Sequence, residues 1–429
     1  MQRCVFHRGV VMTKLAIEGG PRAKKHPYGR GKRFGAAELR QLREALEQET
    51  LFYHRGTKVR RMCETFRRMI RAKHCVASSS GTASIHVALG ALGLRPGDEV
   101  ITGPITDFGS VIGILYQNAI PIFCDLEAHT YNMTAKTIEA AITRKTRVIL
   151  VVHLAGNPTD MDPILRLAKR RGLAVVEDCA QSWLASLRGR FVGTMGDVGC
   201  FSLNDFKHIS AGDGGMVVTN RDDLAEKLAM FADKNYRRTA GGTPLREIAS
   251  LAPNYRMTEL QGAVGLAQLG KLKSICRRRH IEGDGITRGI RGIPGVHPHE
   301  VVAGGRCTYW FYMMRVEPGV LGVSREEFVA ALQAEGLAAS AGYISHPLYL
   351  WEIFRRRSAF PGTHFPWDSR FARKGIRYRR GDCPVAEEIL ATSVRLTVNE
   401  HHTKTDVRET VAGVRKVAGY YLAKQGIEL

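Results

Sequence analysis

The stretch VILVVHLAGNPTDMDPILRLAKRRGLAVVED, residues 148–178, holds the pattern that decides the fold. Apolar and β-branched residues dominate 148–152 and 173–177, whereas 162–171 places apolar side chains three and four positions apart. The first two segments are typical of buried strands and the third of a helix with one apolar face. A strand, a helix and a strand in succession predict two parallel strands joined by a right-handed crossover.

The same alternation continues on both sides of this unit. Strands are predicted at 120–124, 198–202 and 215–219, and helices at 84–92 and 134–142. The sequence therefore predicts an α/β fold, with a mostly parallel sheet covered by helices on its faces. Ligands of such sheets bind at the C-terminal ends of the strands, so the residues that follow these strands are the first candidates for a site.

Beyond residue 257 the pattern changes. Residues 258–279 have apolar side chains at helical spacing, over a length that can join two domains. A strand at 309–316 and a helix at 324–335 then indicate a smaller α+β domain. We expect an N-terminal lead at 1–20, a large domain at 21–285 and a small C-terminal domain at 286–429.

Composition narrows the class of protein. The 429 residues are 44% hydrophobic and 24% charged, which supports a large core and excludes disorder. With 63 Lys and Arg against 41 Asp and Glu, the net charge of +22 favours anionic partners. No window approaches the roughly 18 apolar residues of a membrane span, and no secretory signal is recognisable. The nine cysteines form no CxxC pair, so we expect a cytoplasmic protein with neither a metal site nor disulfides.

Residues 351–380 form the most basic segment, with nine Lys or Arg against two acidic residues and with several aromatic side chains. Cations interleaved with stacking partners are what a single-stranded nucleic acid needs. The same composition suits a surface loop that lines a site for a phosphorylated or polyhydroxylated substrate. We favour the loop over nucleic-acid binding.

Three motifs carry residues suited to a catalytic site. The first is SSSGT at residues 78–82, directly before a predicted helix. Backbone N–H groups, hydroxyls and the positive end of the helix dipole converge there, which suits a phosphate. Ser80, Gly81 and Thr82 would equally serve as an ordinary helix cap.

The second and third motifs follow predicted strands. VVEDCAQ at 175–181 ends a strand in Asp178, a carboxylate that can bind a cationic ligand atom or merely cap the next helix. CFSLNDFKH at 200–208 places Lys207 between an apolar strand and a glycine-rich turn. Partial desolvation there would lower the pKa of this lysine and make its amine nucleophilic, although most lysines are simply solvated.

Together, an anion cradle, a carboxylate and a lysine suit pyridoxal 5'-phosphate (PLP), whose phosphate, pyridine nitrogen and aldehyde they would bind. Over about residues 14–416 the sequence also resembles the DegT/StrS family of PLP-dependent nucleotide-sugar and cyclitol aminotransferases. The resemblance is carried, in the family's order, by SSSGTASIHVALGALGLRPGDEVI, PIFCDLEAHTYNM, VVHLAGNPTDMDPI, VVEDCAQSWLA, GDVGCFSLNDFKHISAGDGGMVVTN and NYRMTELQGAVGLAQL. It implies the PLP-dependent transferase fold of type I, with a seven-stranded sheet in the large, PLP-binding domain.

The resemblance also implies a role for each matching residue. Lys207 matches the lysine that holds PLP covalently and moves the proton during transfer, and Asp178 matches the carboxylate that keeps the pyridine nitrogen protonated. Phe108 matches the residue that stacks on the ring, and Gln181 the one that bonds its 3' oxygen. The matching phosphate ligands are Gly81, Thr82 and Ser202, with Ser80 beside them, and Asn254, which the family takes from the partner subunit of a homodimer.

The implied activity is amino transfer from glutamate or glutamine to a keto-sugar or keto-cyclitol, in amino-sugar or antibiotic biosynthesis. A dehydratase branch of the family carries His in place of the lysine. Here Lys207 is present and His208 is only its neighbour, which favours amino transfer. Two alternatives stay open: an aromatising dehydration that forms an aminohydroxybenzoate, and a non-enzymatic nucleic-acid-binding or regulatory protein on the same fold.

Overall fold

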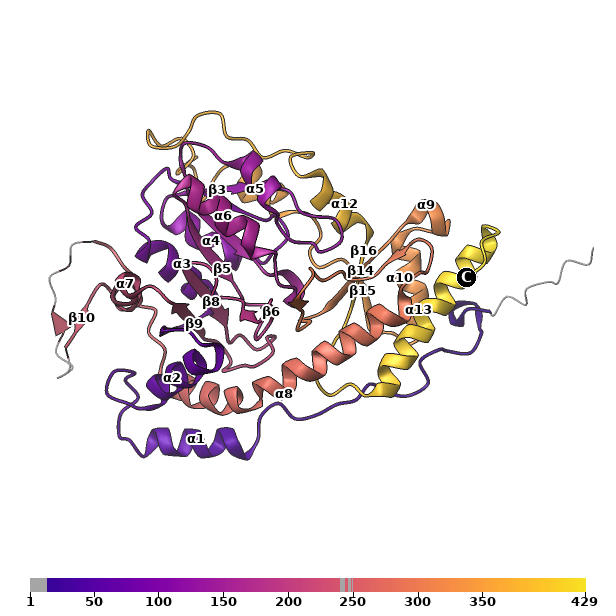
Figure 1. Cartoon of the computed structure of the whole chain (residues 1–429), viewed down its shortest axis with the longest axis horizontal. Coiled ribbons are helices and arrows are strands. Elements are labelled where there is room, and N and C mark those ends of the chain that lie inside the picture. Colours follow the sequence, from indigo (N-terminus) through magenta and orange to yellow (C-terminus); the bar gives the residue numbers. More distant parts are fainter. Residues whose placement is uncertain (1–13, 240–243, 246–247, 249) are drawn as a thin grey trace, which may run out of the picture.

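The computed structural model describes residues 14–239, 244–245, 248 and 250–429. Its centre is a seven-stranded sheet of order β1-β9-β8-β5-β4-β2-β3 (Figure 1). The strands are β1 (His74–Ser78), β2 (Glu99–Thr102), β3 (Ile120–Phe123), β4 (Thr146–Val152), β5 (Ala174–Asp178), β8 (Val198–Ser202) and β9 (Gly215–Thr219). β9 is antiparallel to both of its neighbours, and the other adjacent pairs are parallel. The expectation of a mostly parallel seven-stranded sheet is confirmed.

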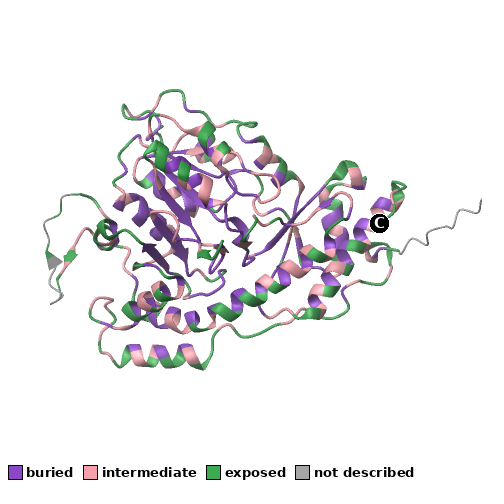
Figure 2. Ribbon diagram, viewed as in Figure 1, coloured by how far each residue is buried: buried purple, intermediate pink, exposed green. Residues whose placement is uncertain are grey.

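Helices cover both faces of this sheet because its strands are apolar on both sides. Val148 and Leu150 of β4 belong to the core cluster that also contains residues of α3 (Gly81–Ala91), α4 (Gly109–Tyr116) and α7 (Asp222–Ala232). Ile149 and Val151 face the opposite cluster, with α5 (Ala135–Ala141) and α6 (Met161–Arg171). This alternation is what a strand buried between two helical layers requires. Figure 2 shows the buried strands between helices whose outer faces are exposed.

A single long helix, α8 (Glu259–Ile290), joins the two parts of the molecule (Figure 1). It packs against α1 (Ala36–Leu46) and α2 (Lys58–Ile70) near one end and against α13 (Lys404–Lys424) near the other. The helix continues past the expected residue 279 because Gly283 and Gly289 let neighbours pack on it: a Cβ at either position would lie 2.4 Å from a side-chain atom of Tyr309 or Val411. The expected division at 285–286 therefore falls inside α8, and the division into two domains stays a prediction.

A smaller antiparallel sheet follows α8, with strand order β12-β14-β16-β15. Its strands are β12 (Val296–His297), β14 (Tyr312–Val316), β15 (Ala339–Ala341) and β16 (Ser393–Leu396). The helices in this part of the chain are α9 (Pro318–Leu321), α10 (Arg325–Ala334), α11 (Glu352–Arg355), α12 (Pro384–Thr392) and α13. The predicted helix at 324–335 is α10, where the Ser324 side chain accepts a hydrogen bond from the N–H of Glu327.

Shorter elements complete the described chain. They are η1 (Ala16–Glu18), η2 (Leu154–Gly156), η3 (Leu348–Leu350), β6 (Ser186–Leu187), β7 (Arg190–Phe191), β10 (Arg237–Arg238), β11 (Pro244–Leu245) and β13 (Gly305–Arg306). Of the expected lead at 1–20, residues 1–13 lie outside the described residues, and Leu15 is buried in the core of the smaller sheet. Within the part that the structure describes, the helices are all too short or too polar to cross a membrane.

Candidate active site

The C-terminal ends of β5 and β8 lie side by side in the large sheet. Asp178 is the last residue of β5 and Ser202 the last of β8, and Asp178 is opposite Cys200 in the register of the two parallel strands. Parallel strands present their C-terminal ends at one edge, where ligands of such sheets bind. Two of the predicted site residues therefore come from this edge.

The Asp178 carboxylate is buried and held by donors. Asp178 is only 4% exposed. The Ser110 hydroxyl donates a hydrogen bond to Oδ2 (2.6 Å) and the N–H of Ala180 donates to Oδ1 (3.0 Å). Burial raises the pKa of Asp178, whereas these two donors and the charge of Lys207 act to lower it. A carboxylate in this setting gains most from a cationic partner.

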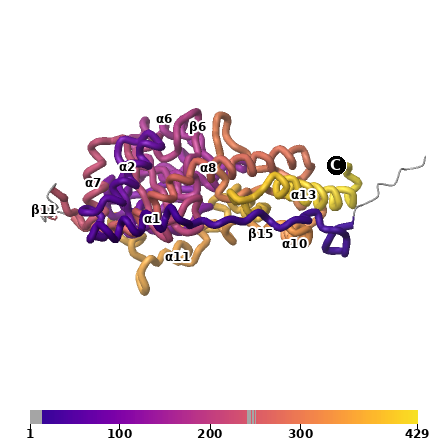
Figure 3. The backbone as a smooth tube through the Cα atoms, turned by 90° about the horizontal axis from the view of Figure 1, so that it is seen from below, coloured from indigo at the N-terminus to yellow at the C-terminus, as the bar shows by residue number. Residues whose placement is uncertain are grey.

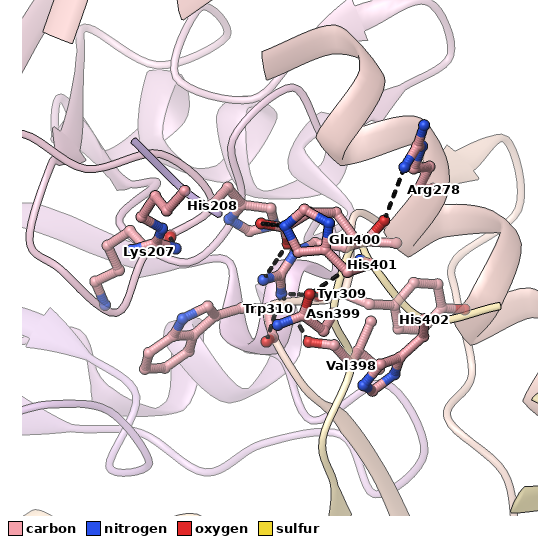
Figure 4. Close-up of polar contacts among 12 residues, drawn as sticks. Lys207, His208, Arg278, Tyr309, Trp310, Val398, Asn399, Glu400, His401 and His402 are labelled. Atoms are coloured by element: carbon pink, nitrogen blue, oxygen red, sulfur yellow. Dashed lines mark hydrogen bonds and ion pairs between the residues drawn. The ribbon is translucent and has the colours of Figure 1, made fainter. Parts of the chain in front are cut away.

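Lys207 is also buried, at 9% exposure, in the loop between β8 and β9. Its backbone N–H donates to the carbonyl of Asn204 (3.0 Å), and its Nζ lies 3.8 Å from the ring centre of Trp310 (Figure 4). Burial lowers the pKa of Lys207, and the charges of Asp178 and Asp107 oppose that shift. The amine lies in an environment that favours its neutral, nucleophilic form.

The N-terminus of α3 meets the end of β8 at close range. Ser80 caps the helix, since its Oγ accepts a hydrogen bond from the N–H of Ala83 (3.0 Å). A Cβ at Gly81 would lie 2.5 Å from the Cβ of Ser202, and a Cβ at Gly109 would lie 2.6 Å from Oγ1 of Thr82. Because neither glycine has a side chain, Ser202 and the start of α4 can pack closely against the first turn of α3, an 11-residue helix. Free N–H groups, hydroxyls and a helix dipole make this turn fit a phosphate.

Phe108 and Gln181 are fixed by neighbours from distant parts of the chain. The Phe108 ring stacks on Trp351, with centroids 5.9 Å apart and planes at 20°. The Gln181 amide accepts a hydrogen bond from the N–H of Ala155 (2.8 Å) and donates one to the Tyr343 hydroxyl (3.3 Å). Both side chains therefore have set orientations beside the edge that carries Asp178.

Asn254 stands apart from the other predicted residues. It lies in the exposed chain before α8, where its backbone pairs with Asp233 and its side-chain oxygen accepts a hydrogen bond from the N–H of Arg256 (3.5 Å). Among the described residues, no contact joins Asn254 to Asp178 or Lys207. One chain thus assembles all of the predicted site residues except this one.

The structure adds residues that no motif indicated. Arg33 donates hydrogen bonds to the carbonyls of Asp205 and Lys207, the second at 2.6 Å. It thereby fixes the backbone of the loop that carries Lys207. Ser110 holds Asp178, and Trp310 covers the Lys207 ammonium. Arginine, serine and tryptophan at these places carry no spacing signal, because their partners lie far away in the sequence.

A buried ion pair positions Trp310. Arg279 of α8 donates to the carbonyls of Val398 (3.1 Å) and Trp310 (3.2 Å), and its guanidinium lies 2.7 Å from the Glu400 carboxylate (Figure 4). Burial alone would raise the pKa of Glu400, yet the charge and hydrogen bonds of Arg279 hold it below its ordinary value. His208 points toward this region, where its Nε2 donates to the carbonyl of Thr308 (3.0 Å).

A second buried polar network lies next to Asp178. Glu177 accepts hydrogen bonds from His153 Nε2 (2.9 Å) and from three backbone N–H groups within residues 193–196. Potential metal-ligating atoms of His153, Glu177 and Cys179 lie within 4.8 Å of one another. Because these four donors already occupy the Glu177 carboxylate, the network serves to tie β4 and β5 to the following loop.

The chain is similar to known aminotransferases. The DegT/DnrJ/EryC1/StrS aminotransferase family matches residues 33–415. A putative L-glutamine:3-amino-2,3-dideoxy-scyllo-inosose aminotransferase of Streptoalloteichus tenebrarius is 34% identical over 422 residues, covering 94% of this chain and 98% of that protein. The GDP-perosamine synthase of Caulobacter vibrioides is 33% identical, covering 80% and 86%. An aminotransferase structure from Psychrobacter cryohalolentis superposes with a TM-score of 0.80 at 28% identity, covering 91% and 98%.

Proposed function

Because this chain belongs to the DegT/DnrJ/EryC1/StrS aminotransferase family, we propose that it moves an amino group from glutamate or glutamine to a keto-sugar or keto-cyclitol, with PLP as its cofactor. The chain is an aminotransferase with the α/β fold of type I. The observation that carries the proposal is the burial of Lys207 and Asp178 close enough for each to shift the pKa of the other, beside the N-terminus of α3.

The residues at the sheet edge fit PLP. Gly81, Thr82 and Ser202, with the cap residue Ser80, would bind its phosphate at the first turn of α3. Asp178 would face the pyridine nitrogen, Phe108 would stack on the ring and Gln181 would bond its 3' oxygen. When bound, PLP supplies the electron sink that amino transfer needs.

The chain's own residues would supply the remaining chemistry. Lys207 would anchor the cofactor and then carry the proton between the reacting carbon atoms, and burial, which lowers the pKa of its amine, favours this role. Asp178, which accepts hydrogen bonds from Ser110 and from the N–H of Ala180, would keep the ring nitrogen protonated. Trp310 shields the lysine on one side, so its ring would exclude water from the amine. One cofactor would serve the two substrates in turn.

The exposed position of Asn254 supports a homodimer. Its side chain is exposed and far from contact with the residues at the sheet edge, as a residue that binds in the site of a second copy would be. We propose that Asn254 of each chain completes the phosphate site of its partner.

Lys207→Ala tests the function most directly. Purified wild-type protein should absorb visible light through its bound cofactor, and glutamate or glutamine should change that spectrum. The variant should show neither property and should lose at least roughly 10²- to 10⁴-fold in turnover, because the group that moves the proton is gone. Lys227→Ala, an exposed lysine of α7, is the matched control. A Lys207→Ala protein that keeps both the spectrum and the turnover would contradict the proposal.

The aromatising dehydratase is distinguished by its acceptor. In that case aminodehydroquinate would be consumed without an amino donor, whereas the proposed enzyme would aminate keto-sugars or inososes only when a donor is present. Against the separate branch in which His replaces the lysine, His208 is buried and its ring donates to the carbonyl of Thr308, which favours amino transfer.

A further inference from the structure

The cysteines of the described chain fall into two groups. Cys63 and Cys75 are half-buried, and the others are buried. A buried thiol acts as a small apolar group, whereas a thiol must be reachable to be oxidised. The buried group consists of Cys124, Cys179, Cys200, Cys276, Cys307 and Cys383. Among the described cysteines, Cys63 and Cys75 are therefore the two that are open to chemistry.

Cys63 and Cys75 come from two elements that pack together. Cys63 lies on α2 and Cys75 on β1, at the end of the molecule away from α13, where α2 and α7 are neighbours (Figure 3). Both side chains pack against the core cluster that contains Phe66 and Trp183. Burial raises the pKa of Cys75 well above its ordinary value, and a hydrogen bond with the Cys63 thiol raises it further. The two sulfur atoms are therefore neighbours across the contact between helix and strand.

A cavity of about 590 Å³ gives access to both thiols. Residues 73–77, which include most of the edge strand β1, line it together with residues of α2 and α7. Cys63 and Cys75 both belong to this lining. The volume lies within the roughly 300–1,000 Å³ of small-molecule sites. A small reagent can thus reach the pair without unfolding the chain.

The two thiols are suited to different steps of an exchange reaction. The raised pKa keeps Cys75 protonated, so Cys75 is a poor first nucleophile. Part of that shift comes from the charge of a Cys63 thiolate, and this part disappears once the Cys63 sulfur is bonded to another sulfur. Cys75 would then lie beside a mixed disulfide that it can attack. The geometry therefore assigns the first attack to Cys63 and the second to Cys75.

We propose that Cys63 and Cys75 form a reversible disulfide, with a small-molecule disulfide that enters the cavity as the oxidant. The Cys63 thiolate attacks one sulfur of the small disulfide and releases the first small thiolate. Cys75 then attacks the Cys63 sulfur and releases the second. The two protein thiols are oxidised, the small disulfide is reduced to two thiols, and the protons that the cysteines lose are taken up by the released thiolates.

This pair is separate from the proposed amino transfer. Neither cysteine belongs to the candidate active site, and both thiols are free in the structure, as the sequence led us to expect. Oxidation would close the loop of residues 63–75 and tie α2 to β1. Because β1 ends at Ser78, directly before the first turn of α3, the bond would hold the strand that leads into the candidate phosphate site.

The test incubates the PLP-loaded enzyme with glutathione disulfide, blocks the remaining thiols and maps the cysteine-containing peptides by mass spectrometry. We expect the peptides of Cys63 and Cys75 to be linked to each other and to separate when a reducing agent is added. Cys276 packs in the same core cluster at 4% exposure and should stay free, so it is the internal control.

Two variants test the order of attack. Cys75→Ser should keep glutathione on Cys63, because the thiol that would displace it is gone. Cys63→Ser should take up glutathione at Cys75 at least roughly tenfold more slowly, since burial still raises the pKa of Cys75. An unchanged cofactor spectrum checks that each variant is folded.

The outcomes that overturn the inference do not depend on activity, so they are distinct from a failure of the proposed function. Wild-type protein in which both thiols stay free, or in which each carries its own glutathione without a link, would show that the pair does not form a disulfide. Equal rates in Cys63→Ser and Cys75→Ser would overturn the assigned order of attack.

Discussion

The two sides of the candidate site hold their charges differently. On the cofactor side, Asp178 and Lys207 are buried and each is held by hydrogen bonds or an aromatic ring. On the side built from 343–380, Arg355 and Arg379 are exposed, and within the described chain their side chains form no ion pair. Burial shifts the pKa values of Asp178 and Lys207, and the surrounding contacts hold both side chains in one orientation. These are the properties that a catalytic site needs. Exposed cations stay solvated, so changing one of them costs little free energy of unfolding.

Removing the buried arginine is the strongest way to break the cofactor side. Arg279→Met leaves the Glu400 carboxylate buried without its partner and releases the carbonyl of Trp310. We expect a loss of about 3–5 kcal/mol in the free energy of unfolding, measured in urea. Arg277→Met, on an exposed face of the same helix, should cost far less. Glu400→Leu added to Arg279→Met should recover much of the loss, and a double variant as unstable as the single one would refute this account.

A milder change alters the charge balance at Asp178. Ser110→Ala removes the hydroxyl that donates to Asp178. The free energy of unfolding should fall by about 1–3 kcal/mol, and the pKa of the Asp178 carboxyl should rise further. Asp178 is then protonated at a higher pH. As the pH falls, affinity for PLP should therefore be lost earlier in the variant than in the wild type. Titrating PLP affinity against pH checks this, with Ser110→Thr as the variant that keeps a hydroxyl; an unmoved midpoint in Ser110→Ala would rule it out.

The smallest effect is expected on the exposed side. Arg379→Gln removes a cation that makes no ion pair in the described chain, so the free energy of unfolding should change by less than about 0.5 kcal/mol. Urea unfolding without ligand measures this. A loss comparable to that of Arg279→Met would show that the arginine holds the segment together, and the contrast between the two sides would disappear.

Much of the large sheet could be predicted because its signals are local. The strands at 198–202 and 215–219 have the predicted bounds, and 120–124 and 173–177 differ from the structure by one residue at one or both ends. A short run of apolar residues is enough to predict a fully buried strand. The helix at 258–279 was too short, because its last turns depend on close packing of Tyr309 and Val411 against glycines, and glycine by itself predicts a helix end.

Some residues of the candidate site could likewise be predicted from local sequence, and others could not. Asp178 and Lys207 follow apolar strands, so their place at the sheet edge follows from the strand pattern. Arg33 and Trp310 reach Lys207 from segments far before and far after it in the sequence, and no spacing connects them. In 351–380 the composition indicated both rings and cations, but only burial separates the rings that anchor from the cations that remain free.

What the sequence by itself determined is the order of strands and helices, the helix cap at Ser80, and the lysine and carboxylate at the strand ends, because apolar spacing and capping act over a few neighbouring residues. Only the tertiary structure decided which groups are desolvated and which arginines have acidic partners. The physical reason is that charge interactions depend on distance and burial in three dimensions, which residues far apart in the chain acquire only when it folds.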